Sequence, residues 1–368
     1  MFRTLKALKD RTLKTLKKTI LIVLVFSPLL LLGQAFGVVS NSSASGEVSM
    51  DSKEVEQIIF QGLDYLHQDE VFKAVDEFKK LIDLFPNDPI GYFYVSASLQ
   101  TMMDDYRNYS YSDEFNKYMD LAIEKGEKIK KKGNLTAYDC LYLGGAIGYR
   151  GINEALTGDW YHGFIDGLRA KGYLEKALKL NPEFYDVYYG LGTYHFWKSL
   201  KTKIFWWLPF AKDNRQVGID MIKLAIEKGK YATEDAKLAL VRIYVENKEY
   251  ENAFAMANEL MKSQPAKPFL LWFLGRAQME TKMYAGAINT YQTLLKTLIA
   301  SPYYHPEGEV ECRYNLALAY FENKNFEDSQ KQIDAILTFK EKSQENKNIK
   351  HFIEDAKGLR KKIKKHAS

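Results

Sequence analysis

One stretch of the chain, residues 58–86, limits what the rest can fold into. It reads IIFQGLDYLHQDEVFKAVDEFKKLIDLFP, and apolar or small residues recur in it every three or four positions, in two runs. Polar residues from Gln68 to Glu70 separate the runs, and Pro86 closes the second one. This pattern predicts two helices joined by a tight turn. Because a single helix pair leaves an apolar face uncovered, we expect further pairs to stack on it.

The small and aromatic residues of this stretch recur at defined positions, which we number as slots from Val55 as slot 1. The marked slots hold Gly62 (slot 8), Tyr65 (slot 11), Ala74 (slot 20), Phe78 (slot 24) and Pro86 (slot 32). Small residues let two helices cross closely, and aromatic residues fill the space beside the crossing. The arrangement resembles the tetratricopeptide repeat (TPR) family. That resemblance implies a right-handed α-solenoid whose ligands lie along the concave face built by the first helix of each pair.

Later segments repeat the same spacing. Regular units are predicted at 236–265, 269–298 and 311–337, and a degenerate unit follows the first one, with the tyrosine-rich turn Asp104–Ser112 inserted between its helices. The sequence therefore predicts an all-α solenoid of about seven antiparallel helix pairs. We place the repeat array at 54–340, its irregular glycine-rich centre at 136–215 and a C-terminal capping helix at 347–366.

Charge and cysteine content narrow the function. The first nineteen residues hold seven basic residues and one acidic residue, which accounts for the whole formal net charge of +5. The remainder is close to neutral, which argues against binding to nucleic-acid phosphates. Cys140 and Cys312 are predicted to be buried small hydrophobic residues. A disulfide between them would require the ends of the array to come together, and we expect none.

The N-terminus has the parts of a secretory signal. A basic segment precedes the apolar run Ile20–Leu32, and Gly33-Gln34-Ala35 offers a cleavage site. Alternatively, Ile20–Val39 forms one uncharged stretch long enough to span a bilayer as an anchor. Residues 1–39 are thus a signal peptide or a membrane anchor, and 40–53 form a Ser-rich linker. Either alternative places the repeats outside the cytoplasm, in the periplasm or cell envelope.

The centre of the array, 136–215, departs from the regular spacing. Its two long helices contain more glycine than packing normally needs: Gly144, Gly148, Gly151, Gly163, Gly167 and Gly172. Each glycine inside a helix costs about 1 kcal/mol relative to alanine, so we expect very close helix contact in return. An insertion follows at 199–214 and contains the aromatic run Phe205–Phe210. This run either plugs a gap in the array or presents an apolar tip to a membrane or partner.

The same central third is similar to a second group, the eukaryotic inclusion-body-clearance family of TPR proteins. The resemblance rests on the glycine–aromatic helix pair, the Gly190-Leu191-Gly192 helix followed by an apolar insertion containing Pro209, and a helix start running from Asn214 to Gly218. It implies the architecture of the middle section. The export signal departs from that family's setting, and we transfer no activity.

No constellation in the sequence carries recognisable chemistry. The glycine-rich stretches lie inside helical patterns and follow no predicted strand, and GxxxxGK[ST], GxSxG and HExxH are absent. His162 and Asp166 stand one helical turn apart and, with His195, suggest a metal site, but a hydrogen-bonded polar pair explains them more simply. Among the carboxylates near the glycines, Glu154, Asp159 and Asp166, none is singled out as catalytic. We therefore expect no enzyme activity, no cofactor and no metal.

Binding residues are expected at slots 2, 5, 9, 12 and 13 of the first helices, as the TPR resemblance implies. Aromatic residues and arginines dominate these slots, and such residues supply most binding energy at interfaces. The predicted partner-binding residues are Tyr142, Tyr149, Arg150, Tyr189, Trp197, Arg242, Trp272, Arg276 and Tyr314. For each aromatic residue, packing against a neighbouring first helix remains the alternative. A chaperone-type carboxylate clamp is not expected, because no Lys or Asn accompanies the arginines at these slots.

The sequence thus favours an exported, non-catalytic scaffold that holds a peptide or protein partner of the cell envelope in its concave groove. In that hypothesis, changing Trp272 and Arg276 to alanine abolishes binding without altering stability. The alternative is an extracytoplasmic receptor for a small apolar ligand or lipid, associated with a transporter and using a cavity in the glycine-rich centre. Membrane contact through the N-terminal segment or Phe205–Phe210 is also open.

Overall fold

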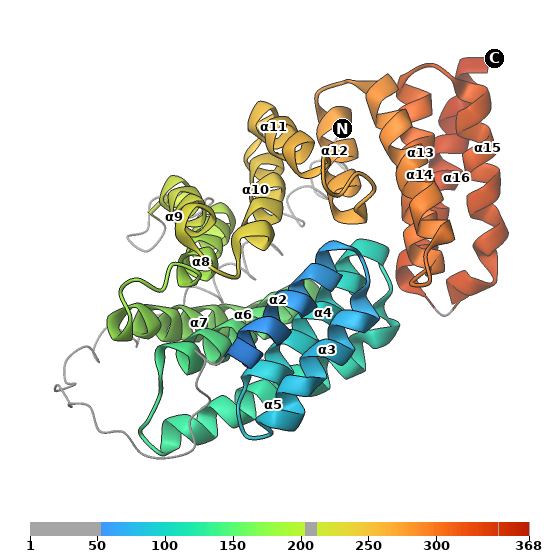
Figure 1. Ribbon diagram of the computed structural model, residues 1–368. Helices are drawn as coiled ribbons and strands as arrows, with labels where there is room; N and C mark the ends of the chain where they lie inside the picture. Colours follow the sequence, from blue (N-terminus) through green and yellow to red (C-terminus); the bar gives the residue numbers. More distant parts are fainter. Residues whose placement is uncertain (1–52, 203–211, 345, 368) are drawn as a thin grey trace, which may run out of the picture. The chain divides into compact units, whose positions relative to one another are not determined.

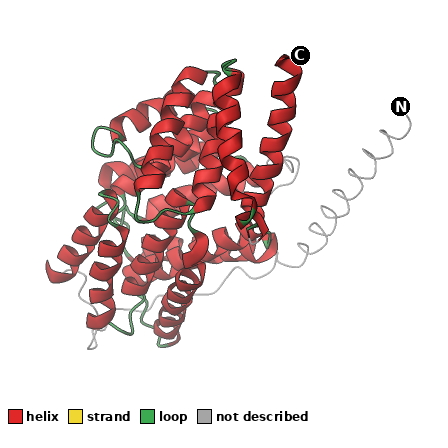
Figure 2. Cartoon of the chain, turned by 90° about the vertical axis from the view of Figure 1, so that its right-hand side faces the viewer, coloured by secondary structure: helices red, strands yellow, loops and turns green. Residues whose placement is uncertain are grey.

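Helices make up every regular element in the part of the chain that the structure describes (Figures 1 and 2). The computed structural model describes residues 53–202, 212–344 and 346–367. The predicted signal or anchor, nearly all of the linker and the Phe205–Phe210 run lie outside these ranges. Those predictions therefore remain expectations from the sequence.

The described helices form seven successive pairs and one final helix, which confirms the predicted all-α solenoid and its number of pairs. The pairs are α2 (Lys53–His67) with α3 (Val71–Leu84), α4 (Ile90–Tyr106) with α5 (Ser112–Lys131), α6 (Ala137–Thr157) with α7 (Trp160–Leu180), α8 (Val187–Thr202) with α9 (Arg215–Lys228), α10 (Thr233–Asn247) with α11 (Tyr250–Leu260), α12 (Pro268–Glu280) with α13 (Tyr284–Ala300), and α14 (Pro306–Glu322) with α15 (Phe326–Leu337). Three short 3₁₀ helices are η1 (Tyr109–Tyr111), η4 (Thr338–Lys340) and η5 (Lys342–Gln344). The last helix, α16 (Lys347–Ala367), packs against α14 and α15 and covers their apolar side.

Contact between slots 8 and 24 explains the pairing. A Cβ atom added to Gly62 would lie 2.4 Å from the Phe78 ring, and one added to Gly275 would lie 2.7 Å from the Tyr291 ring. In both pairs the space between the ring and slot 8 is too small for a side chain, so these two glycines set the distance between the helices of their pairs. The aromatic residues occupy the space beside the crossing, as the spacing predicts.

The turn inside a pair follows one rule in four of the seven pairs. Counted from positions 55, 234, 268 and 310 as slot 1, its left-handed residue stands at slot 15 in each case, with φ between 62° and 64°: Asp69, Lys248, Lys282 and Lys324. In the second pair, counted from position 89, the left-handed residue is Arg107, with φ 55°, and it stands at slot 19. Helix α4 therefore continues about one turn further than the regular spacing allows.

Several central glycines serve close helix contact. A Cβ on Gly163 of α7 would lie 2.6 Å from the carbonyl oxygen of Gly151 in α6, and one on Gly192 of α8 would lie 2.5 Å from that of Gly218 in α9. At these crossings the backbones touch, which confirms the expectation of close approach for Gly144, Gly151 and Gly163. It is not confirmed for Gly148 and Gly167, whose added Cβ atoms would make ordinary contacts at 3.5 and 3.6 Å, or for Gly172, whose added Cβ has no atom within 4 Å.

The array also closes on itself within the residues described. The end of α4 contacts α12 and the start of α14, although more than 160 residues separate these elements in the sequence. One apolar core accordingly joins side chains of α2–α6 with side chains of α12–α14. The sequence analysis did not anticipate this closure. Cys140 and Cys312 are both buried and free.

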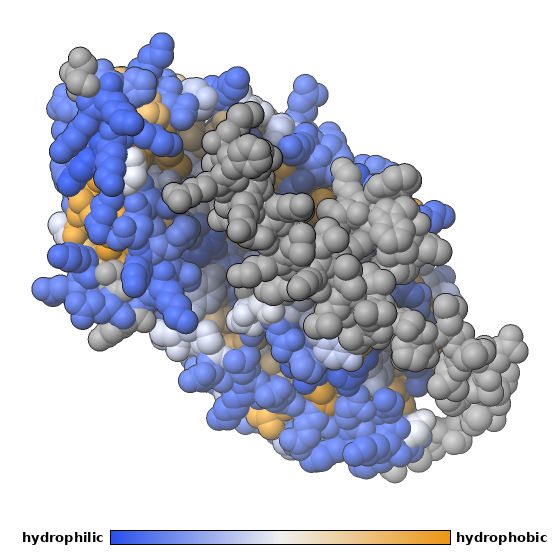
Figure 3. All heavy atoms as spheres, turned by 180° about the vertical axis from the view of Figure 1, so that it is seen from behind, coloured by the Kyte–Doolittle hydropathy of each residue, from blue (hydrophilic) through white to orange (hydrophobic). Residues whose placement is uncertain are grey.

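Figure 3 shows one face, on which the coloured residues are mainly hydrophilic and the apolar spots are small and separate. Among the described helices, none combines the length and apolar character needed to cross a membrane.

The close helix crossing makes a stability prediction with a matched control. We expect Gly192→Ala to lower the free energy of unfolding by about 1–3 kcal/mol, because the new methyl group has no space against the Gly218 carbonyl. Gly172→Ala should instead raise it by up to about 1 kcal/mol, because this helical glycine faces open space. Urea titrations followed by circular dichroism measure both changes. A stabilised Gly192→Ala variant would contradict the crossing geometry.

Candidate functional site

The extra turn of α4 and the residues after it, 104–112, form what we call the closing segment. It reaches the far end of the array through side chains that are mostly buried. The indole Nε1–H of Trp272 in α12 donates to the backbone carbonyl of Asp105, with an N···O distance of 2.9 Å. The Lys267 ammonium lies 3.5 Å from the Asp105 carboxylate, and the two side chains are 4% and 2% exposed. Lys267 also approaches the Leu66 carbonyl at 3.4 Å.

The next residues of the closing segment extend the contact to α13 and α14. The Arg107 guanidinium stacks on the Trp272 ring at 4.5 Å and donates to Glu311 at 2.9 Å. The Asn108 amide donates to the Tyr303 carbonyl at 3.2 Å. Gly308 meets the backbone here, since an added Cβ would lie 2.5 Å from the carbonyl oxygen of Tyr106. Closure therefore depends on a glycine in α14 as well as on charges.

A pocket of about 320 Å³ lies where the closing segment meets the concave face. Its wall combines Arg107 of the closing segment, Arg242 and Glu246 of α10, Trp272, Phe273 and Arg276 of α12, Tyr291 of α13, and Glu311 and Asn315 of α14. Five elements that are distant in sequence thus contribute to one site. A volume of this size admits a side chain or a chain end and suits a small part of a partner.

Two of the three arginines that line the pocket form ion pairs, and the third does not. Arg107 pairs with Glu311 at 2.9 Å, and Arg276 pairs with Glu246 at 2.7 Å and with Glu280 at 2.9 Å. Arg242 differs from both, because among the described residues no hydrogen bond or ion pair within 4 Å is found for its guanidinium. The pocket therefore carries one positive charge in excess of its glutamates.

Aromatic rings hold this third arginine in place. The Arg242 guanidinium lies 4.8 Å from the Trp197 ring and 5.8 Å from the Phe273 ring. Its Nε is buried without a hydrogen-bond partner among the described groups. Stacking fixes the plane of a guanidinium and leaves its edge free to donate two parallel hydrogen bonds. The arrangement presents a donor pair suited to a carboxylate.

The structure brings together some of the predicted binding residues and separates others. Arg242, Trp272 and Arg276 line the pocket, and Trp197 stands behind Arg242. Trp272 is 5% exposed and bonded to α4, so the expectation that its replacement leaves stability unaltered is wrong. A partner in this pocket therefore meets Trp272 as part of a wall that also holds the array closed.

The remaining predicted residues lie elsewhere. Tyr142 is 2% exposed and packs its ring against Phe93 and Tyr94, so it belongs to the core and does not line the groove. Tyr149 also contacts Phe93, Tyr189 packs with the core cluster of α8–α12, and Tyr314 packs on Phe352 of the capping helix. For these tyrosines the packing alternative describes the contacts that the structure shows.

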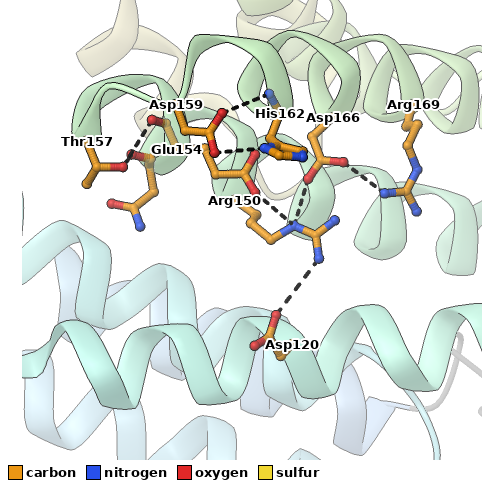
Figure 4. A network of polar contacts seen from close by, with 9 residues as sticks. Asp120, Arg150, Glu154, Thr157, Asp159, His162, Asp166 and Arg169 are labelled. Atoms are coloured by element: carbon orange, nitrogen blue, oxygen red, sulfur yellow. Dashed lines mark hydrogen bonds and ion pairs between the residues drawn. The ribbon is translucent and has the colours of Figure 1, made fainter.

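Arg150 belongs to a polar network between α5, α6 and α7 (Figure 4). Its guanidinium donates to the buried Asp166 carboxylate at 2.7 Å, and Arg169 donates to the other oxygen of Asp166 at 2.8 Å. Asp120 of α5 approaches Arg150 at 3.9 Å. Two arginines thus engage one buried carboxylate, and the contact of Arg150 with Asp166 ties the glycine-rich helices together.

Figure 4 also shows the contact that His162 makes. Its Nδ1 lies 2.7 Å from the Asp159 carboxylate, and this bond raises the pKa of His162. Because Asp166 is engaged by arginines, the two residues do not converge on a shared metal position. Within the described ranges no group of three or more His, Cys, Asp or Glu side chains is arranged to hold a metal ion. Burial raises the pKa of Glu154, and nearby Asp166 and Asp159 raise it further, while Arg150 and His162 lower it.

Sequence reasoning missed six residues of the pocket, Phe273 and Tyr291 among them. Glu246 and Glu311 occupy slots of the expected binding face, but only aromatic residues and arginines were selected there. Asn315 also lines the pocket, but it stands at slot 6, which is not one of the slots expected to bind. Arg107 was missed because its insertion was treated as an irregular turn. The displaced left-handed position, slot 19 in place of slot 15, is the signal that marks it.

Comparisons with known proteins find likeness in structure alone. No protein-family model matches the chain, and no curated protein matches it. The C-terminal part of a TPR repeat-containing protein from Cytophaga hutchinsonii aligns with 80% of this chain and 99% of its own, at 17% identity and a TM-score of 0.42. The human IFIT1 dimer with PPP-AAAA aligns with 71% of this chain and 67% of its own, at 17% identity and a TM-score of 0.41. NprR in complex with its cognate peptide NprX aligns with 84% and 85%, at 15% identity and a TM-score of 0.41.

The role of Trp272 in closure yields a prediction. Trp272→Phe removes the hydrogen bond to the Asp105 carbonyl and leaves space beside Arg107, so we expect it to lower the free energy of unfolding by about 1–3 kcal/mol. Trp160→Phe is the control, since Trp160 is 56% exposed and should change stability by less than about 1 kcal/mol. Thermal and urea unfolding compare the two. Equal effects would show that Trp272 does not hold the closing segment.

Proposed function

We propose that this protein is a non-catalytic scaffold that holds an acidic group of a peptide or protein partner in the pocket around Arg242. The single observation that carries the proposal is the arginine itself, stacked on Trp197 and Phe273 and lacking an ion pair among the described residues. A buried guanidinium Nε–H without a hydrogen-bond partner costs free energy, and a partner carboxylate that accepts from it removes that cost.

The neighbouring groups indicate what kind of partner fits. Glu246 and Glu311 line the same wall as the arginines, so a polyanion such as nucleic acid meets repulsion there while a single carboxylate meets Arg242. Trp272, Phe273 and Tyr291 supply apolar surface beside the charge. We therefore propose a ligand with one carboxylate next to an apolar or aromatic side chain, as in a short acidic peptide segment or a C-terminus.

The N-terminal sequence supports a proposal for where the scaffold works. Its basic start, apolar run and small residues lead us to propose export to the periplasm or cell envelope, with the signal cleaved or retained as an anchor. The partner is then a protein or peptide of the same compartment. The alternative, a receptor for a small apolar ligand, loses support because it needs a cavity in the glycine-rich centre. There the space beside Gly151 and Gly163 is occupied by the neighbouring helix, and Tyr142 is buried.

Replacing the free arginine tests the proposal. We expect Arg242→Gln to weaken binding of an isolated partner segment by about 10- to 100-fold, the loss typical of a hydrogen-bonded charge. Arg360→Gln, on the capping helix and outside the pocket, is the control and should bind normally. Isothermal titration with purified partner, identified by crosslinking in cell-envelope extracts, measures both.

A charge swap makes the test specific. Arg242→Glu should fail to bind the natural partner and should recover binding when the partner's acidic residue is changed to arginine. Full binding by Arg242→Gln, or failure of every acidic residue of the partner to matter, would exclude this pocket as the site.

Export has its own measurement. If the signal is cleaved near Gly33–Ala35, the mass of the mature protein purified from its source should lack about the first 35 residues. An intact N-terminus in a membrane fraction would instead establish the anchor. A full-length protein in the cytoplasm would contradict both forms of the proposal.

A further inference from the structure

We propose that the contact between the closing segment and helices α12–α14 is a pH-sensitive latch that is closed in mildly acidic solution and opens as the solution becomes alkaline, dismantling the pocket when it opens. The biological meaning of this latch rests on the proposed function, because the latch controls the site assigned there. Its physical basis is independent of any partner.

The latch and the pocket share their residues. Arg107 supplies one wall of the pocket, and its position depends on stacking with Trp272 and pairing with Glu311. Trp272 in turn bonds to the closing segment at Asp105. If the closing segment moves away from α12, the pocket therefore loses Arg107, and the Trp272 indole loses its acceptor. An open array retains Arg242 but lacks the enclosed site around it.

Carboxyl groups crowd the latch more than cations do. Lys267 is the ammonium that faces Asp105, and Arg107 is committed to Glu311. The charged groups that act on Asp105 are Lys267 before α12, Asp69 at the α2–α3 turn, and Asp104 and Arg107 at the end of α4. A second layer of titratable groups surrounds these: Tyr106 beside Asp69, Asp235 and His67 beside Lys267, and His305 beside Arg107. Gathering this many acids away from water penalises their charged forms.

The pKa values run in the direction that this crowding predicts. Burial raises the pKa of Asp105 to about 7, although Lys267 opposes the change. Burial likewise raises the pKa of Asp69, Asp104 and Asp235. Burial lowers the pKa of His305, which opposes closure in acid.

The sign of the effect follows from linkage. A solvated Asp105 in the open array titrates near its ordinary pKa of 3.8, whereas in the closed array it holds its proton up to about pH 7. The contribution of Asp105 to closure is therefore fully present at low pH and is lost as pH rises through 7. Between pH 6 and pH 8 this contribution to the closed-to-open ratio falls about tenfold.

Pulsed electron spin resonance can measure the two states directly. Nitroxide labels on Lys73→Cys in α3 and Lys296→Cys in α13, both exposed positions, report the distance between the two sides of the latch. The native thiols are buried, and burial raises the pKa of Cys140 to about 11, so brief labelling at neutral pH selects the introduced cysteines. The label distances are recorded at pH 6 and pH 8.

Variants of Asp105 isolate its contribution. Asp105→Asn keeps the shape of the side chain and the backbone carbonyl but does not titrate. The closed-to-open ratio is measured for the wild type and for this variant at both pH values. The wild-type ratio divided by the variant ratio should be about tenfold lower at pH 8 than at pH 6. The comparison cancels His305, which is present in both proteins. Asp113→Asn on α5 is the matched control and should behave as wild type. The double variant Asp105→Asn/Lys267→Met repeats the test without a buried unpaired ammonium, in case the single variant folds poorly.

Two results would overturn the latch. An unchanged distance distribution in the wild type between pH 6 and pH 8 would show that the array does not open. A pH response kept in full by the Asp105 variants would show that another group drives it. Neither result depends on a partner, so a failure of the proposed function, seen as normal partner binding by Arg242→Gln, remains distinguishable from a failure of the latch.

Discussion

A lysine ammonium buried inside a protein needs polar partners, and in this structure that need joins an early helix pair to a late one. Lys267 stands just before α12 with 4% of its side chain exposed, and the groups that face it are the Asp105 carboxyl at the end of α4 and the Leu66 carbonyl at the end of α2. Leaving the ammonium without such partners in the interior would cost several kcal/mol. The position of the closing segment, and with it Arg107 and the pocket, follows from keeping these groups together.

The repeat architecture was readable from the sequence because it depends on neighbours in the chain. Gly62 and Phe78 meet within one helix pair, and their spacing recurs wherever a pair is regular, so the pattern predicted the number of pairs and the final helix. Closure was not readable in the same way. It joins Asp105 to Trp272 across 167 positions, and no local periodicity reports such a contact. Its one local trace is the extra turn that ends at Arg107.

The candidate site was predicted in part for the same reason. The positions expected to bind follow from the geometry of one repeat. They predicted Arg242, Trp272 and Arg276, which the structure brings into one pocket. The slots could not show that Tyr142 is enclosed by Phe93 and Tyr94, because that burial depends on how successive pairs are rotated. Nor could they show which of the three arginines lacks an ion pair within 4 Å. That distinction depends on glutamates from other helices, Glu246 beside Arg276 and Glu311 beside Arg107.

The bond between the closing segment and α14 also changes how such an array folds. In an open solenoid each repeat touches only its neighbours, so the ends fray and unfolding proceeds one unit at a time. Here Arg107 pairs with Glu311 across 204 positions, which ties an early repeat to the last one. Unfolding that reaches α4 from one side or α14 from the other must break this tie, so the repeats between them are coupled into a more cooperative unit. The ring of contacts can close only after both halves exist, so the final step of folding carries the entropic cost of a long loop.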